Sequence, residues 1–143
     1  MKQVRFTIPR PPKGKGRPRF SRVNGHVMTY TPDSTANYEE LVRWSWKSQC
    51  GVSFEAGVPL KVSIFGFFPI AKSISKKKHA ELAGKPHTNK VDCDNLAKAV
   101  LDAMNHLAFY DDSQISDLYV VKRYSDSPRV EVRIEPMEEN EHE

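Results

Sequence analysis

The spacing of apolar residues predicts several short strands along the chain. Residues 4–8 and 26–30 are short extended segments, and residues 60–69 form a nearly continuous apolar run of the kind found in a buried central strand. Residues 115–124 and 129–134 alternate apolar and polar positions, and the Ser-Asp-Ser-Pro segment between them has the composition of a turn. The last two strands are therefore expected to form a hairpin.

Helical spacing predicts three helices between these strands. The first begins near Asp33 and Ser34 and ends near Gly51. The second is a short, lysine-rich helix that starts after Ser73 or Ser75 and runs to Gly84. In the third, at residues 95–107, the apolar residues recur every three or four positions, as in a helix that rests on a sheet.

The order of strands and helices indicates an α+β fold. A single domain at residues 1–135, with helices packed on one face of a small mixed β-sheet, accommodates this order. Residues 136–143 form a short acidic tail that is expected to be disordered. The two cysteines lack the spacing of a zinc site or a disulfide framework, so we expect free thiols.

Composition and charge narrow the class of partner. With 38% hydrophobic and 28% charged residues, the chain is typical of globular proteins, and it has neither a membrane-length apolar run nor a signal peptide. We expect a cytoplasmic protein. Five of its eighteen acidic residues follow Arg133, so the remainder carries a net charge of +9 rather than the overall +4. Such an excess of positive charge favours a polyanionic partner.

Much of this positive charge lies in an arm at residues 10–22. The segment is rich in glycine and proline, which predicts an irregular backbone and close approach to a ligand. Its lysines and arginines are candidates for contacts with the phosphates of DNA: Lys13, Lys15, Arg17, Arg19 and Arg22. Basic arms are often only solvated, so the arm alone leaves DNA binding open.

The start of the third predicted helix carries a pair of carboxylates. Asp92 and Asp94 could simply cap the helix and interact with its dipole, although only one of them can be the N-cap. Asp94, Lys98 and Asp102 are spaced by four and share one helix face, which is also the spacing of a surface salt bridge. Spacing alone does not separate these roles from catalysis.

A second acidic pair, Asp111 and Asp112, follows the same helix and changes this assessment. If the next strand runs back beside the start of the helix, four carboxylates converge. Such a cluster needs a cation, and Mg²⁺ or Mn²⁺ prefers oxygen ligands. The spacing fits neither an EF-hand nor a P-loop. An acidic metal centre within a basic protein points to phosphodiester hydrolysis.

These segments resemble a known family. DCDNLAKAVLDAMN and FYDDSQI, together with KGRPRF and TYTP nearer the N-terminus, are similar to motifs of the RusA family of Holliday junction resolvases. The resemblance implies a homodimer that makes paired, symmetric nicks in four-way DNA with Mg²⁺. From the carboxylate ligands we expect that Mn²⁺ can substitute for it. The resemblance further implies that Asp92, Asp94 and Asp112 bind the metal, that Lys98 is needed for cleavage, and that Asp111 and Asp102 have supporting roles.

Two other functions remain open from the sequence. One is an architectural DNA-binding protein without catalysis, and the other is a metal nuclease that is less selective among branched DNAs. Phe20, Tyr30, Trp44, Trp46 and the Phe65–Phe68 group are expected to pack in the core, whereas His87 and His106 are expected at the surface. Ala97 and Leu101 are candidates for dimer contacts, although a broad core face explains them equally well.

Overall fold

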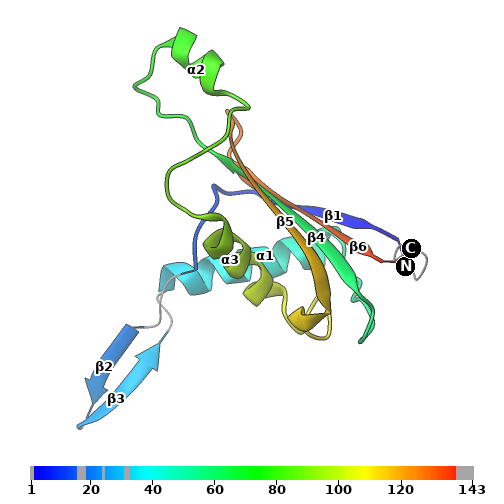
Figure 1. Cartoon of the computed structure of the whole chain (residues 1–143). Helices are drawn as coiled ribbons and strands as arrows, with labels where there is room; N and C mark the ends of the chain where they lie inside the picture. Colours follow the sequence, from blue (N-terminus) through cyan, green and yellow to red (C-terminus); the bar gives the residue numbers. More distant parts are fainter. Residues whose placement is uncertain (1, 16–18, 24, 31–32, 138–143) are drawn as a thin grey trace.

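The protein forms a mixed four-stranded sheet and a separate two-stranded hairpin (Figure 1). This computed structural model describes residues 2–15, 19–23, 25–30 and 33–137, with only the backbone described for the hairpin strands and residue 33. The order across the main sheet is β1 (Val4–Ile8), β6 (Arg129–Pro136), β4 (Leu60–Phe68) and β5 (Ile115–Tyr124). The expected α+β architecture is confirmed.

Strand β4 is the centre of the sheet, as its apolar run predicts. It pairs antiparallel with β6 and parallel with β5, with Ile64 opposite both Val132 and Val120. Because β4 lies between β5 and β6, the expected hairpin of these two strands is wrong. The Ser-Asp-Ser-Pro turn instead carries the chain across the end of β4, where the Ser125 amide donates a hydrogen bond to the Phe68 carbonyl at 2.9 Å.

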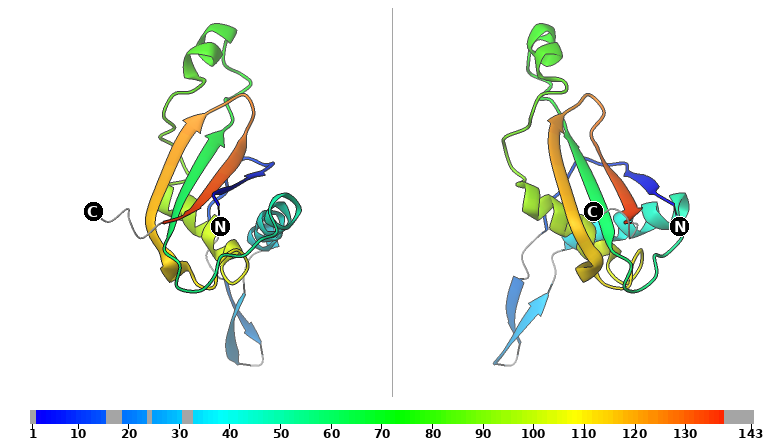
Figure 2. Two further views of the ribbon diagram at one scale, coloured as in Figure 1. Left: turned by 90° about the vertical axis from the view of Figure 1, so that its right-hand side faces the viewer. Right: turned by 45° about the vertical axis from the view of Figure 1, so that its right-hand side comes forward.

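Helices α1 (Asp33–Gln49) and α3 (Cys93–Met104) pack against one another on the same face of the sheet (Figures 1 and 2). The core lies between them and the inner side chains of the strands. Trp46 of α1 is 1% exposed and meets the ring of Phe6 edge-on, with the ring centroids 5.5 Å apart. Leu96, Val100 and Met104 form the buried stripe that the sequence pattern of α3 predicts.

The C-terminal end of α1 is fixed to the edge of the sheet. The side-chain amide of Gln49 accepts a hydrogen bond from the Thr7 amide at 2.8 Å and donates one to the Thr7 carbonyl at 2.7 Å. It thus satisfies backbone groups at the edge strand β1 that would otherwise lack a neighbouring strand. Gly51 then turns the chain with a φ of 69°, and its amide donates to the Trp46 carbonyl. The predicted end of this helix is confirmed.

The basic arm is irregular only in part. Residues 11–15 have no regular secondary structure, but β2 (Arg19–Val23) pairs antiparallel with β3 (His26–Tyr30), which corrects the expectation of an irregular arm up to residue 22. This hairpin extends away from the main sheet near the start of α1 (Figure 2). The predicted extended segment at residues 26–30 is confirmed as β3.

The remaining elements lie in the connections. Ser75 is the N-cap of α2 (Lys76–Leu82), as expected, and the 3₁₀ helix η1 (Asp112–Gln114) joins the end of α3 to β5. Strand β6 continues to Pro136, and residues 138–143 of the acidic tail lie outside the described part of the chain. None of the helices described is long and apolar enough to cross a membrane.

Burial tests several expectations for single side chains and corrects one of them, that for Trp44. Ala97 is 3% exposed within the core and Leu101 packs against it, so the broad core face accounts for both residues without a dimer contact. Trp44, expected in the core, is 61% exposed, whereas Trp46 is buried as expected. Phe20 and Tyr30 lie in the hairpin, where side chains are outside the described residues.

Candidate metal and DNA site

The basic arm crosses the start of α3. Pro12 lies over Gly66 of β4, where an added Cβ would come within 3.3 Å of its ring and 2.7 Å of Leu96. Two residues later, a Cβ on Gly14 would lie 2.8 Å from the Asn95 side chain and 2.9 Å from Val91. Glycine at position 14 therefore allows the arm to press against the segment that carries Asp92 and Asp94.

Asp92 and Asp94 present exposed carboxylates at this end of the helix. Asp92 occupies the N-cap position, and its backbone carbonyl accepts the first helical hydrogen bond from Leu96 at 3.0 Å. Its side chain makes no capping hydrogen bond, so helix capping does not explain the carboxylate. Asp94 lies in the first turn, and Cys93 between them is also exposed.

Lys98 lies one turn further along the exposed side of α3. Among the described residues it has no ion pair with Asp94 or Asp102, so the salt bridge that the spacing allows is absent. Asp102 instead contacts Lys15 of the arm, with 3.4 Å between the carboxylate oxygen and Nζ. Within the described part of the chain, Lys98 is therefore a cation without an ion pair, one helical turn from Asp94.

Lys15 is held between two helices. Its ammonium forms an ion pair with Glu39 of α1 as well as with Asp102 of α3. Burial lowers the pKa of Lys15, but these two carboxylates outweigh that effect and raise it overall. Asp102 therefore has a structural role in anchoring the arm, and Lys15 is less available for DNA than a free lysine.

The two residues of the second acidic pair, Asp111 and Asp112, have different roles at η1. Asp111 is the N-cap of η1, where its carboxylate accepts hydrogen bonds from the Ser113 amide, at 3.1 Å, and from the Ser113 hydroxyl. These hydrogen bonds lower the pKa of Asp111. Gln114 completes a capping box and binds the carbonyls of Glu55 and Val58. Asp111 is thus a structural residue that orders the turn next to Asp112.

Asp112 has an exposed carboxylate that takes no part in this capping. Its backbone amide donates a hydrogen bond to the Asn105 side chain at 3.0 Å, which fixes η1 to the C-terminal end of α3. Asp92 and Asp94 lie at the other end of this helix, and twelve helical residues span about 18 Å. The strand that follows, β5, does run back along α3 (Figure 1), but the hydrogen bond to Asn105 keeps Asp112 at the far end of the helix.

The carboxylates of one chain are therefore not assembled for metal binding. Across residues 2–15, 19–23, 25–30 and 33–137, no group of three His, Cys, Asp or Glu side chains is close enough to bind one ion. Asp92, Asp94 and Asp112 nevertheless fit Mg²⁺ by chemistry, since each offers exposed carboxylate oxygens that form no ion pair or side-chain hydrogen bond with a described residue. Cys93 is a soft ligand unsuited to Mg²⁺.

The loop that precedes Asp92 contains a buried histidine, His87, whose burial the sequence did not predict. His87 was expected at the surface but is 9% exposed, with its ring stacked on Phe68 at a centroid distance of 3.6 Å. Its amide donates to the Lys122 carbonyl at 3.1 Å, and Lys122 Nζ donates to the Asn89 carbonyl at 2.7 Å. These contacts attach the loop to β5. His106, by contrast, is exposed as expected.

The burial of His87 predicts a loss of stability in mild acid. Burial and the charge of Lys122 lower the pKa of His87 below its ordinary value of 6.5. Below pH 6.5, His87 is therefore protonated more fully in the unfolded chain than in the folded protein. As the pH is lowered from 6.5, the free energy of unfolding decreases until the pH is below the folded-state pKa. Urea unfolding at pH 7.5 and 5.5 measures this loss. The difference in the free energy of unfolding between the two pH values should be smaller in His87→Phe, which retains a stacking ring, than in the wild-type protein. An equal difference in both proteins would contradict the role of His87.

The DNA-contact candidates in the arm differ in their surroundings. Lys13 is half-buried and forms no ion pair within the described chain, unlike Lys15. Arg17 lies outside the described residues, and only the backbone of Arg19 and Arg22 is described, in β2. Of this set, Lys13 is thus the described basic side chain without an ion pair to a described residue, and the residue after it, Gly14, lies against Val91 and Asn95 at the acidic end of α3.

Comparisons with known proteins identify the family of the chain. The sequence model of the family described as Endodeoxyribonuclease RusA matches residues 9–135, which include the arm, both acidic pairs and the whole main sheet except β1 and the end of β6. An uncharacterized protein of Bacillus subtilis (strain 168), YqaN, is 38% identical over 135 residues, covering 92% of this chain and 94% of the relative.

Proposed function

Because the chain belongs to the RusA endodeoxyribonuclease family, we propose that it resolves Holliday junctions in DNA recombination and repair by paired, symmetric, Mg²⁺-dependent nicks. The observation that carries this proposal is the acidic end of α3. There, the side chains of Asp92 and Asp94 are exposed, that of Asp92 makes no capping hydrogen bond, and a basic arm lies directly against the same turn. Carboxylates alone repel phosphate, so this combination is suited to a metal-bridged DNA strand.

In this proposal Asp92, Asp94 and Asp112 hold the ion, and Mn²⁺ can replace Mg²⁺. A bound divalent ion supplies Lewis-acid activation of the scissile phosphate and lowers the pKa of an attacking water. Asp111 keeps the turn before β5 in place by capping η1, so that Asp112 stays exposed. Lys13, Arg17, Arg19 and Arg22 are the proposed contacts to backbone phosphates.

The separation of the carboxylates favours a homodimer. Asp112 lies a helix length, about 18 Å, from the Asp92 end of the same α3, far beyond the reach of one ion. Two copies related by a twofold axis can bring Asp112 of one copy to Asp92 and Asp94 of the other. The same symmetry suits a four-way junction in which two strands are cut.

Lys98 is proposed to stabilise the charge that develops on the phosphate during cleavage. It has no carboxylate partner among the described residues, which argues against a role in orienting an aspartate. Lys98→Met is therefore expected to lower the single-turnover cleavage rate by about a hundredfold or more, with unchanged metal affinity. Lys98→Arg, which keeps the charge, is expected to retain more activity. Weaker metal binding by Lys98→Met would instead indicate a structural lysine.

The test of this function compares three DNA substrates of equal length. Wild-type protein with Mg²⁺ should nick a synthetic four-way junction much faster than a flap or a linear duplex. Equal cleavage of all three would indicate a less selective metal nuclease. Binding of the junction without any nicking would indicate an architectural DNA-binding protein.

A further inference from the structure

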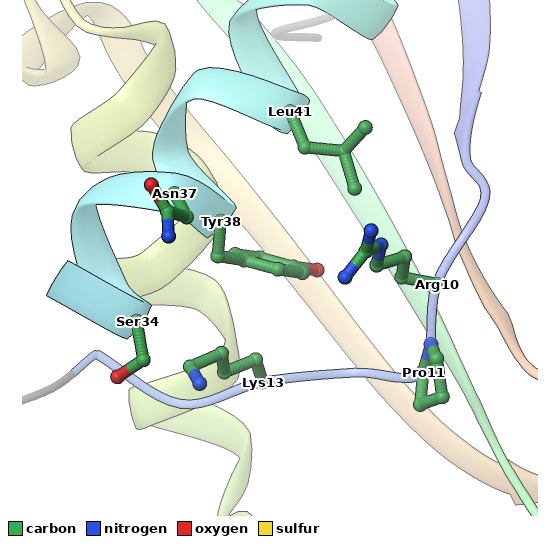
Figure 3. A pocket seen from close by; sticks show the side chains of 7 residues that line it. All are labelled: Arg10, Pro11, Lys13, Ser34, Asn37, Tyr38 and Leu41. Atoms are coloured by element: carbon green, nitrogen blue, oxygen red, sulfur yellow. The ribbon is translucent and has the colours of Figure 1, made fainter.

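A hollow of about 450 Å³ lies between the basic arm and the N-terminal half of α1 (Figure 3). Two of its walls are apolar and come from Pro11 and Leu41. The other side chains around it can all donate hydrogen bonds: Arg10, Lys13, Ser34, Asn37 and Tyr38. Ser34, Asn37, Tyr38 and Leu41 follow helical spacing, so one face of α1 forms the whole side opposite the arm.

Tyr38 is the feature that marks this hollow as a binding site. The residue is 6% exposed, yet its phenol oxygen has no hydrogen-bond partner among the described residues. Figure 3 shows this oxygen and the guanidinium of Arg10 directed toward one another across the hollow. Burial raises the pKa of Tyr38 well above its usual range, so the phenol keeps its proton and acts as a donor. A buried donor without an acceptor is costly, and a ligand oxygen would remove that cost.

The described charges around the hollow are positive, and no described carboxylate compensates them. Neither Arg10 nor Lys13 forms an ion pair with any described residue, whereas Lys15, two residues further, is held by Glu39 and Asp102. No carboxylate belongs to the described lining. The N-terminal turn of the 17-residue helix α1 borders the same space and adds the positive end of its dipole. An anionic ligand fits these surroundings.

We propose that this hollow binds a phosphodiester group of a DNA strand together with its sugar. Arg10 can bind two phosphate oxygens through its planar fork, while Lys13 and the Tyr38 hydroxyl supply further donors. The volume exceeds what a phosphate alone fills, and the apolar walls formed by Pro11 and Leu41 can accept the deoxyribose. The proposal rests on the proposed function, because it assumes a DNA substrate.

The position of the hollow suggests how it contributes to that function. Lys13 lines the hollow, and the next residue, Gly14, packs against Val91 and Asn95 beside the exposed carboxylates. A strand held at the hollow is thus anchored next to Asp92 and Asp94. The residues of the hollow are therefore positioning residues, and their loss should weaken DNA binding more than it slows the cleavage of bound DNA.

The test measures binding of a four-way junction in EDTA, at several KCl concentrations, by fluorescence anisotropy. Tyr38→Phe removes only the unpartnered hydroxyl, and it should weaken binding by about tenfold without changing the salt dependence, because no charge is lost. Arg10→Gln and Lys13→Gln should each reduce the slope of log affinity against log salt by about one. Lys47→Gln, at the other end of α1, is the matched control and should keep the wild-type slope.

Thermal unfolding with added inorganic phosphate, at fixed ionic strength, completes the test and distinguishes the sources of phosphate. Wild-type protein should gain thermal stability from phosphate, and Tyr38→Phe should gain less, although its stability without phosphate should be equal or higher. Unchanged junction binding in Tyr38→Phe together with unchanged salt slopes in the Arg10 and Lys13 variants would overturn the proposal, even if wild-type protein nicks junctions. A phosphate effect without any junction effect would also overturn it, in favour of a free phosphate ligand.

Discussion

Asp92→Asn is expected to remove nearly all DNA nicking and leave the fold intact. Asparagine is as good an N-cap residue as aspartate, and the Asp92 side chain makes no capping hydrogen bond that could be lost. The substitution removes the negative charge from a proposed metal ligand, so the single-turnover rate with saturating Mg²⁺ should fall by about a hundredfold to a thousandfold. Junction affinity in EDTA should stay the same or rise, because an acid facing the phosphates is neutralised.

Asp111→Asn is the matched control for this prediction. It is the same substitution in the other acidic pair, at a carboxylate that caps η1 rather than lying free. Asparagine can keep much of this capping, so the nicking rate should fall far less than in Asp92→Asn. Equal losses in the two variants would contradict the division of roles between the two acidic pairs.

The second large effect concerns how α3 is held on the sheet. Leu96 is fully buried, and Leu96→Ala should lower the free energy of unfolding by about 2–5 kcal/mol. Gly66→Ala should cost about 1–3 kcal/mol, because its Cβ would lie 2.7 Å from the Leu96 methyl carbon. In the double variant that methyl carbon is absent, so the combined loss in urea unfolding should be smaller than the sum by about 1 kcal/mol.

Leu60→Ala provides the control for this coupling. Leu60 is equally buried on the same strand, six residues or about 20 Å from Gly66, so its loss should add to that of Gly66→Ala. Strict additivity in the Leu96 and Gly66 pair would mean that α3 does not approach β4 as described. Because Leu96 is two residues from Asp94, we also expect slower nicking in Leu96→Ala.

Local patterns were sufficient for the elements that carry the site. The apolar stripe of α3 and the continuous run of β4 follow directly from the residues they bury, and Asp92 and Asp94 were placed correctly at the start of the helix. The resemblance of the acidic segments identified the family, and the match of the family model over residues 9–135 confirms it. Charge and spacing alone predicted only a metal site that acts on a phosphate group.

Features that depend on pairing between distant segments could not be predicted. The turn between β5 and β6 has hairpin chemistry, but β4, from much earlier in the chain, takes the place between them. His87 is buried because it meets Phe68 and Tyr124, contacts that no local pattern encodes. Strand β2 was missed because its basic residues mask a short alternation, and the hollow depends on Arg10 and Tyr38, which are distant in sequence.

The most direct test of the central claim is to map the nicks in a four-way junction with each strand labelled in turn. With Mg²⁺, wild-type protein should cut two opposing strands at symmetric positions, and ligase should be able to seal the products. Omission of the metal should abolish both cuts. Cleavage that persists in EDTA, or that falls at unrelated positions in all four strands, would contradict a metal-dependent junction resolvase built on Asp92, Asp94 and Asp112.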